Sequence, residues 1–280
     1  MNNVNRTLYI PLYGKAYVSK RSLFIKDEKA EEIWEAEQFA LKRKSRSKWL
    51  AFYMGIRSAV FDGWLRSKLS QKEGAAVIHI GCGMDSRAVR IGDLAGYSVW
   101  YDVDMPGVIA ERRRYFTETE RYKMISGDAR CLDRLGEDIR GKRAIVVMEG
   151  VSMYLSESEL KSAIAAICSR FAEVELLMDC YSVFAAKMSK FKNPVNDVGV
   201  SSVFGFDDPF ALETGGIRYV GDLEMTPKHY VDQLSGSEKF IFKRLYAGGI
   251  SKKLYKLYEY RKKQSDESIR CSYNRSRALL

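Results

Sequence analysis

The chain has 280 residues, 46% of them hydrophobic, and its formal net charge at pH 7 is +10. A chain of this length and composition can bury a large core, which excludes wholesale disorder. It contains no apolar run long enough to cross a bilayer, and its first residues lack the apolar core of a secretory signal. We therefore expect a cytoplasmic protein.

Five cysteines are scattered along the chain, without a C-x-x-C pair or a histidine cluster beside them. We therefore expect neither a bound metal nor a disulfide framework. Much of the positive charge follows residue 242, where 11 lysines and arginines accompany 3 acidic residues. Basic segments can bind nucleic acid or membranes, but most are solvated surfaces, so we expect neither partner. The polar, aperiodic residues 264–280 predict a basic, weakly ordered tail.

Residues 1–70 predict a helical cap, because apolar residues recur at helical spacing over 29–44 and 47–69. In residues 71–263, apolar strands alternate with helices. We expect strands at 76–80, 98–102, 122–126, 144–149, 173–179 and near 217–220, and a last, antiparallel strand at 254–261. We expect helices at 86–94, 106–117, 131–138 and 156–170, the last opened by a capping box of Ser156 and Glu159. This alternation predicts an α/β fold with a mostly parallel sheet and helices on both faces.

Residues 181–216 break the alternation after the fifth expected strand, with turn signals at Asn193-Pro194 and Asp208-Pro209. We interpret this stretch as an insertion over the carboxyl ends of the strands, where open sheets bind ligands. Its aromatic residues fit a lid over a substrate as well as they fit an ordinary core.

A glycine turn follows the first expected strand, with Gly81 and Gly83 in a G-x-G pattern. Glycine lets the backbone turn sharply and approach a ligand closely. Asp102 and Asp104 end the next strand, where an acidic side chain can bind both hydroxyls of a ribose. Ser86 replaces the third glycine of the dinucleotide fingerprint, which argues against a pyrophosphate. The pattern predicts a nucleoside-bearing cofactor, although a tight strand-to-helix turn of any α/β protein would also explain the two glycines.

Four motifs make the pattern more specific. They are Gly81–Arg87 (GCGMDSR), Tyr101–Pro106 (YDVDMP), Gly127–Arg130 (GDAR) and Glu149–Leu155 (EGVSMYL). In this order and spacing, the sequence resembles the leucine carboxyl methyltransferase family, including its bacterial small-molecule branch of polyketide O-methyltransferases. The resemblance covers roughly residues 7–262. It implies a class I, Rossmann-like fold and S-adenosylmethionine as the cofactor.

The resemblance also implies which residues bind the cofactor. Asp104 matches the ribose ligand, and Asp102 is the alternative on the same face of the strand. The backbone amides around Gly81 and Gly83 suit the methionyl carboxylate. Glu149, at the end of an apolar run, needs a cationic partner, and the ammonium group of the cofactor fits this need.

Asp128 would accept the adenine amino group and Ala129 would offer its backbone amide, unless Asp128 only caps the helix that begins at Cys131. Arg57 matches the family's arginine at the methionyl carboxylate and is preferred to Arg66.

Lys15 resembles the N-terminal basic residue of the family, and Lys20 is close enough in sequence to compete with it.

The acceptor side is less defined. Arg87 and Tyr154 are candidates, and Tyr181 and Phe184 could flank the sulfonium by cation–π attraction. An ionised carboxylate acceptor needs no general base, whereas a phenol needs one near neutral pH, for which His229 is the candidate. His79 lies within the first strand and is expected to be a satisfied core residue.

The leading hypothesis is therefore O-methylation of a carboxylate or polyketide-like phenol of a small molecule. Methyl esterification of a protein C-terminal carboxylate is the second hypothesis. A nicotinamide-dependent oxidoreductase and a basic, non-enzymatic binding protein are further alternatives. The sequence leaves the acceptor, the ester or ether product and the oligomeric state open.

Overall fold

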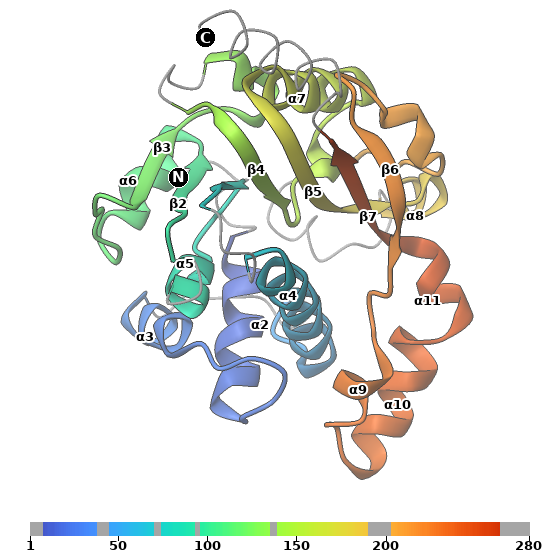
Figure 1. The fold of residues 1–280 in the computed structure, drawn as a ribbon. Helices are drawn as coiled ribbons and strands as arrows, with labels where there is room; N and C mark the ends of the chain where they lie inside the picture. The colour runs from blue at the N-terminus through green and yellow to red at the C-terminus, as the bar shows by residue number, and fades with distance from the viewer. Residues whose placement is uncertain are drawn as a thin grey trace, which may run out of the picture.

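The computed structural model describes residues 8–37, 45–69, 74–92, 96–134, 139–189 and 203–263. These residues form a seven-stranded sheet in the order β3-β2-β1-β4-β5-β7-β6 (Figure 1). The strands are β1 (Ala76–Ile80), β2 (Val99–Asp104), β3 (Tyr122–Ser126), β4 (Gly141–Met148), β5 (Phe171–Tyr181), β6 (Arg218–Leu223) and β7 (Tyr255–Lys262). Strands β1 to β5 pair in parallel, and β7 is antiparallel to both β5 and β6. The predicted α/β fold, with its antiparallel last strand, is confirmed.

The helices of the described residues are α2 (Tyr9–Lys20), α3 (Glu28–Glu37), α4 (Lys48–Leu69), α5 (Arg87–Ile91), α6 (Pro106–Arg112), α7 (Glu157–Arg170), α8 (Val183–Ser189), α9 (Lys228–Val231), α10 (Gly236–Tyr246) and α11 (Gly249–Leu254). Three 3-10 turns join them: η2 (Ala129–Arg134), η3 (Ser152–Tyr154) and η5 (Pro209–Leu212). Ser156 and Glu159 form the expected capping box at the start of α7. Helices α5 and α6 end earlier than the sequence pattern predicts.

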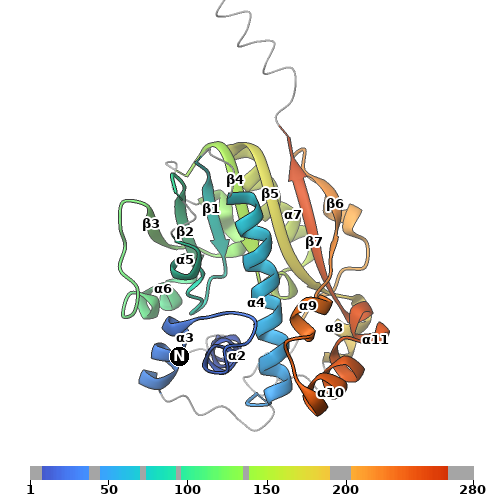
Figure 2. The same ribbon diagram turned by 60° about the horizontal axis from the view of Figure 1, so that its bottom comes forward.

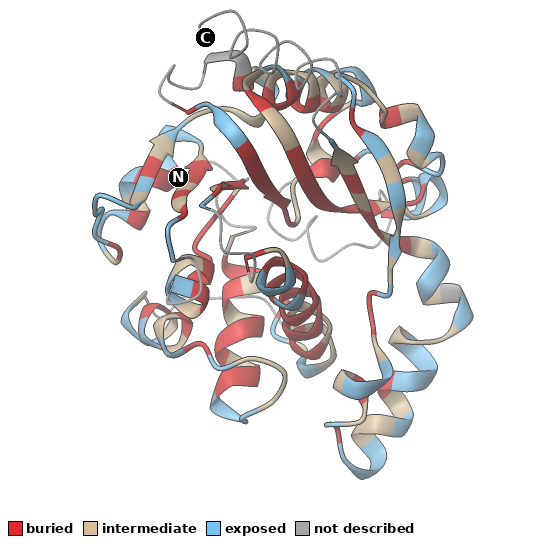
Figure 3. Ribbon diagram, viewed as in Figure 1, coloured by how far each residue is buried: buried red, intermediate tan, exposed pale blue. Residues whose placement is uncertain are grey.

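The sheet is buried between two layers of helices because its central strands are apolar on both faces. Ile78 of β1 and Val146 of β4 belong to the core that α7 completes. Their neighbours Val77 and Val147 point to the opposite face and pack with α4. Figure 2 shows α4 crossing one face of the sheet, with α7 behind it. Figure 3 shows the buried residues gathered on the central strands and on the sides of α2 and α4 that face inward.

The N-terminal cap contains a helix that the sequence pattern does not predict. Helix α2 packs against both α3 and α4. It is buried on most sides, including at Lys15 and Ser19, so its apolar residues do not form one stripe. Gly14 allows the close approach to α4, since a Cβ there would lie 2.8 Å from Met54 Cβ. Of the helix predicted over 29–44, the part after residue 37 lies outside the described residues.

Two insertions lie near the carboxyl ends of the parallel strands. The expected one, after β5, contains α8 and η5, and its residues 190–202 lie outside the described chain. A second insertion, α9 to α11 between β6 and β7, is missing from the prediction (Figure 1). Its helices are short and mostly exposed, so their apolar pattern is weak. The predicted tail, 264–280, also lies outside the described residues.

Candidate functional site

A cavity of about 760 Å³ lies at the carboxyl ends of β1 and β4, within the size range of small-molecule pockets. Its walls come from α2, α4, the turn after β1, the loop after β4, α8 and the helices between β6 and β7. The cavity therefore joins the cap, the sheet and both insertions. This is the position at which open α/β sheets bind ligands.

The glycine turn after β1 forms one side of the cavity. Gly81 and Gly83 both line it, with left-handed φ angles of +66° and +52°. A Cβ on Gly81 would lie 2.1 Å from Val151 Cγ2, so a larger residue would fit there only if Val151 moved. The turn is fixed by the Gly81 amide, which donates to the Val103 carbonyl over 2.7 Å.

Asp104 lies directly behind this turn, at the end of β2. Its Oδ2 accepts from the Gly83 amide over 2.8 Å and its Oδ1 accepts from the Met105 amide over 2.7 Å. Burial raises the pKa of Asp104, while these two backbone hydrogen bonds oppose the shift. The carboxylate thus stands beside the glycine turn, where a ribose ligand is expected.

Asp102, the alternative ribose ligand, is completely buried and does not line the cavity. Its oxygens accept from Trp100 Nε1 over 2.8 Å and from the Tyr122 hydroxyl over 2.7 Å, and it forms an ion pair with Arg112. Burial alone would raise the pKa of Asp102, but Arg112, His79 and Tyr122 lower it to about 2. These contacts anchor β2 to its surroundings. Asp104 does not line the cavity either, but its carboxylate contacts the glycine turn, so Asp104 stays the preferred ribose ligand and Asp102 the alternative, both as predictions.

Lys15 of α2 lines the cavity and is buried, with Nζ 3.1 Å from Asp85 Oδ2. Its competitor Lys20 is on the surface and pairs with Glu35. The structure therefore brings Lys15, and not Lys20, to the glycine turn.

Arg57 of α4 also lines the cavity and bridges the ends of three strands. Its Nε donates to Glu149 Oε1 over 2.9 Å, and its Nη1 donates to Asp179 Oδ2 over 3.1 Å and to the Tyr255 hydroxyl over 2.8 Å. Arg66, the rejected alternative on the same helix, instead donates to the Arg90 carbonyl over 2.9 Å.

Glu149 lines the cavity at the end of β4 and already has cationic partners within the chain. It accepts from Arg57, from Arg87 and from Ser58 Oγ, the last over 3.0 Å. Burial alone would raise the pKa of Glu149, but Arg87 and Arg57 lower it to about 2. The partner expected from the cofactor is therefore supplied, in this structure, by arginines.

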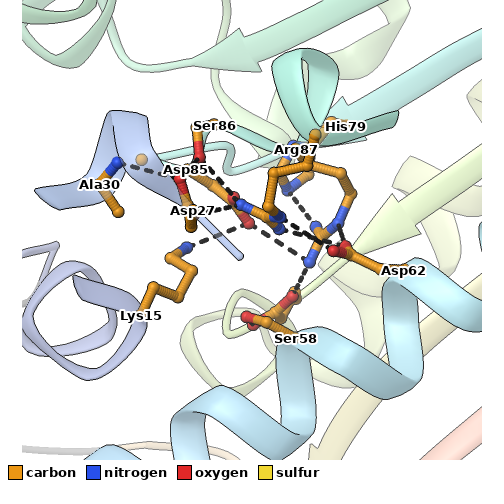
Figure 4. Close-up of polar contacts among 12 residues, drawn as sticks. Lys15, Asp27, Ala30, Ser58, Asp62, His79, Asp85, Ser86 and Arg87 are labelled. Atoms are coloured by element: carbon orange, nitrogen blue, oxygen red, sulfur yellow. Dashed lines mark hydrogen bonds and ion pairs between the residues drawn. The ribbon is translucent and has the colours of Figure 1, made fainter. Parts of the chain in front are cut away.

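Arg87, an acceptor-side candidate, is completely buried and does not line the cavity. Its Nε donates to Asp62 Oδ1 over 2.7 Å, and its Nη1 lies 3.1 Å from His79 Nε2. Figure 4 shows Lys15 reaching Asp85 on one side of this cluster, while Arg87 and Asp62 meet on the other. Arg87 thus holds Asp62 and Glu149 in this structure, and a contact with the acceptor stays a prediction.

The contact with Arg87 also indicates the tautomer of His79. An arginine is always a donor, so His79 Nε2 must accept, which assigns the ring hydrogen to Nδ1. Nδ1 lies 3.4 Å from Asp102 Oδ1. His79 is buried, as expected of a core residue, and it also lines the cavity. The expectation that it is satisfied is wrong, because its Nδ1 has no hydrogen-bond partner among the described residues.

Lys15, Arg57, Arg87 and Glu149 belong to a network of ion pairs. Five further charged residues of this network are missing from the sequence-based site: Asp27, Asp62, Asp85, Arg90 and Asp179. Asp85 lies within the first motif and Asp179 ends a predicted apolar strand, so both carried a signal. Asp179 Oδ1 accepts from the Gly150 amide over 2.7 Å and thereby holds the fourth motif in place.

Asp128 and Ala129 lie at the start of η2 and do not line the cavity. The Asp128 carboxylate accepts from the Arg130 amide over 2.9 Å and forms a surface ion pair with the same residue. This hydrogen bond is the capping role weighed against the adenine contact, which stays a prediction.

Aromatic side chains also line the cavity. They include Tyr154, Tyr181 and Phe184, whose roles toward the acceptor and the sulfonium stay predictions, and Tyr53, Tyr246 and Tyr255, which the sequence analysis missed. His229 is exposed, lies against the Tyr230 ring at 4.1 Å and does not line the cavity. The structure therefore does not bring His229 to this cavity, and its role as catalytic base stays a prediction.

The described part of the chain contains no cluster of three or more potential metal ligands. Within the same residues, no helix is both long and apolar enough to span a membrane.

The sheet order, the glycine turn and the acidic end of β2 together define the class I methyltransferase fold. A crystal structure of magnesium protoporphyrin IX methyltransferase (ChlM) from Synechocystis PCC 6803 has this fold. It aligns with a TM-score of 0.51 and 12% identity, over 84% of this chain and 93% of that one.

The leucine carboxyl methyltransferase model matches residues 11–168, and the chain belongs to that family. The protein is thus an S-adenosylmethionine-dependent methyltransferase. It is 25% identical to the tetracenomycin polyketide synthesis O-methyltransferase TcmP of Streptomyces glaucescens, over 86% of this chain and 90% of TcmP. It is 28% identical to the S-adenosyl-L-methionine-dependent methyltransferase dpfgK of Gibberella zeae, over 63% of this chain and 64% of that protein.

Proposed function

We propose that this enzyme transfers a methyl group from S-adenosylmethionine to a carboxylate oxygen of a small molecule. One observation carries the proposal: a single cavity is lined by a glycine turn, by charged residues and by aromatic rings. The glycine turn and the charged residues suit the amino acid and ribose groups of the donor. The aromatic rings suit an apolar acceptor.

The charged residues of the cavity fit the donor. Lys15 and Arg57 can attract the methionyl carboxylate, and Glu149 can attract the ammonium group. Asp104 can accept from the ribose hydroxyls, and the left-handed Gly81 leaves room for close contact with the backbone. When bound, S-adenosylmethionine supplies an electrophilic methyl group carried on a sulfonium. The chain positions the reactants and excludes water.

The contacts of the side chains that could act as a general base favour a carboxylate acceptor over a phenol acceptor. The carboxylates of Asp85 and Glu149 are held by cations, and His79 Nε2 already accepts from Arg87. The neighbouring cations lower the pKa of both carboxylates, so neither is a good base for a phenol proton. An acceptor that is already anionic needs no such base. The small-molecule acceptor is also supported by the name of the relative TcmP, which acts in polyketide synthesis.

Isothermal titration with S-adenosylmethionine and with NAD tests the donor, and only the first should release heat. Asp104→Ala should abolish that heat, while Asp222→Ala, a change at an exposed surface pair with Lys256, should not. Binding by Asp104→Ala equal to that of the parent would remove the ribose assignment.

The acceptor is tested by incubating a panel of carboxylic acids and phenols with tritiated methyl donor. Base-labile esters are the expected products, and label found only in base-stable ethers would replace the carboxylate with a phenol.

A further inference from the structure

Tyr53 lies on α4, four residues before Arg57, so the two side chains lie on the same helix face, one turn apart. Both line the cavity. Arg57 contacts Glu149 and Asp179. Tyr53 therefore lies one helical turn from a residue proposed to bind the donor.

The Tyr53 ring is held by other rings. Its centroid lies 5.9 Å from that of Tyr246 and 6.1 Å from that of Tyr255, at interplanar angles of 47° and 69°. These are ordinary distances for aromatic pairs. Tyr246 comes from the insertion between β6 and β7, so the orientation of Tyr53 depends on both the cap and that insertion.

The hydroxyls of Tyr53 and Tyr255 differ. The Tyr255 hydroxyl accepts from Arg57 and donates to Asp179. The contacts of Tyr53 within the described chain are ring contacts, and its hydroxyl has no hydrogen-bond partner there. Because Tyr53 is half-buried and lines the cavity, its hydroxyl is available to a ligand that binds there. Burial and, secondarily, Tyr181 raise the pKa of Tyr53, so its hydroxyl keeps its proton near neutral pH and can donate.

We infer that Tyr53 binds the methyl acceptor by donating a hydrogen bond to its carboxylate, and that the acceptor is a flat aromatic carboxylic acid. This inference rests on the proposed function and deepens it. Hydrogen bonds to a charged oxygen are stronger than neutral ones, so a phenol hydroxyl is well suited to hold a carboxylate. The rings of Tyr53, Tyr181 and Tyr255 offer faces and edges to a planar body.

The test uses 2-naphthoate as the probe, titrated into the full chain saturated with S-adenosylhomocysteine. The parent should bind the probe. Tyr53→Phe, which removes only the hydroxyl, should bind it about tenfold more weakly, or about 1.4 kcal/mol. Its dissociation constant for S-adenosylhomocysteine should stay within twofold of the parent's. The matched control is Tyr97→Phe, at an exposed tyrosine that does not line the cavity, and it should leave both constants unchanged.

Three outcomes are informative. Probe binding by Tyr53→Phe within threefold of the parent would overturn the role of Tyr53. A parent that binds S-adenosylhomocysteine but not 2-naphthoate would overturn the acceptor class, with the donor site intact. A parent that binds neither S-adenosylhomocysteine nor S-adenosylmethionine would instead contradict the proposed function itself.

Discussion

Arg57 Nε lies 2.9 Å from Glu149 Oε1, although 92 residues separate the two in sequence. The contact joins the cap helix α4 to the carboxyl end of β4. Because Arg57 also reaches Asp179 and Tyr255, one side chain connects α4 with the ends of three strands. The N-terminal cap is thus a wall of the cavity.

This bridging predicts the effect of Arg57→Lys. A lysine keeps the charge but cannot donate in two directions from a planar fork. Loss of one charge-assisted hydrogen bond, about 1.5 kcal/mol, should weaken S-adenosylmethionine binding about tenfold, measured by isothermal titration. Arg66→Lys is the matched control on the same helix, since Arg66 only donates to a surface carbonyl. Equal affinities of the two variants would contradict the role of Arg57.

Glu149 predicts a pH dependence of stability. Its pKa is about 2 in the folded chain, against about 4.3 in an unfolded one. The unfolded chain therefore binds this proton first as the pH falls. The stabilisation by Glu149 is complete above its unfolded pKa and is lost between about pH 4.3 and pH 2. Glu149→Gln should remove this part of the acid sensitivity and cost about 3 to 5 kcal/mol at pH 7, because it breaks a buried ion pair.

Urea unfolding of the parent and of Glu149→Gln between pH 3 and pH 7 measures both effects. The free energies of unfolding should converge as the pH falls. Glu157→Gln is the control, since Glu157 forms only an exposed pair with Lys161 on α7. A constant difference between parent and Glu149→Gln over this range would show that the Glu149 pKa is not lowered in the folded state.

Most of the sheet could be predicted from the sequence, because each central strand is a continuous apolar run. The helix α2 could not, since its burial on most sides leaves no amphipathic period. The short helices α9 to α11 were missed for the opposite reason, because few of their residues are buried. Their position against the cavity, where Tyr246 meets Tyr53, depends on tertiary packing alone.

The candidate site, like the fold, could be predicted only in part. Sequence motifs correctly brought Lys15, Arg57, Gly81 and Glu149 to one cavity, since the carboxyl ends of parallel strands share one edge. Motifs could not distinguish residues that face the cavity from those that support it. Arg87 follows Ser86 in the first motif, but its side chain does not line the cavity and pairs with Asp62 instead. The direction of such a side chain depends on which charged residues folding brings close to it.

Gly81→Ala should disrupt the glycine turn. Its φ of +66° costs an alanine about 1 to 2 kcal/mol, and the new Cβ would lie 2.1 Å from Val151 Cγ2. We expect a lower melting temperature and loss of measurable S-adenosylmethionine binding. Gly92→Ala is the control, since a Cβ there meets no described atom within 4 Å. Adding Val151→Ala to Gly81→Ala should restore part of the stability by removing the clash, and no recovery would show that backbone strain dominates.

Asp27 predicts how the cap is held on the core. Its buried carboxylate accepts from Arg90 Nη1 over 2.6 Å, from the Ala30 amide over 2.9 Å and from Ser86 Oγ. It therefore caps α3 and ties that helix to α5. Asp27→Ala should lower the free energy of unfolding by about 2 to 4 kcal/mol, because it leaves several buried donors without their acceptor.

The same change should loosen the cap before it loosens the sheet. Hydrogen exchange followed by mass spectrometry should show faster exchange in α2 and α3, with β1 and β4 unchanged. The control is Lys26→Ala, one residue away, where an exposed lysine pairs with Glu28 at the surface. Uniform acceleration across the sheet in Asp27→Ala would mean that cap and core unfold as one unit, and unchanged exchange in α2 would mean that Asp27 does not hold the cap. Because Lys15 and Arg57 line the cavity from α2 and α4, faster opening of the cap should also raise the dissociation constant for S-adenosylmethionine.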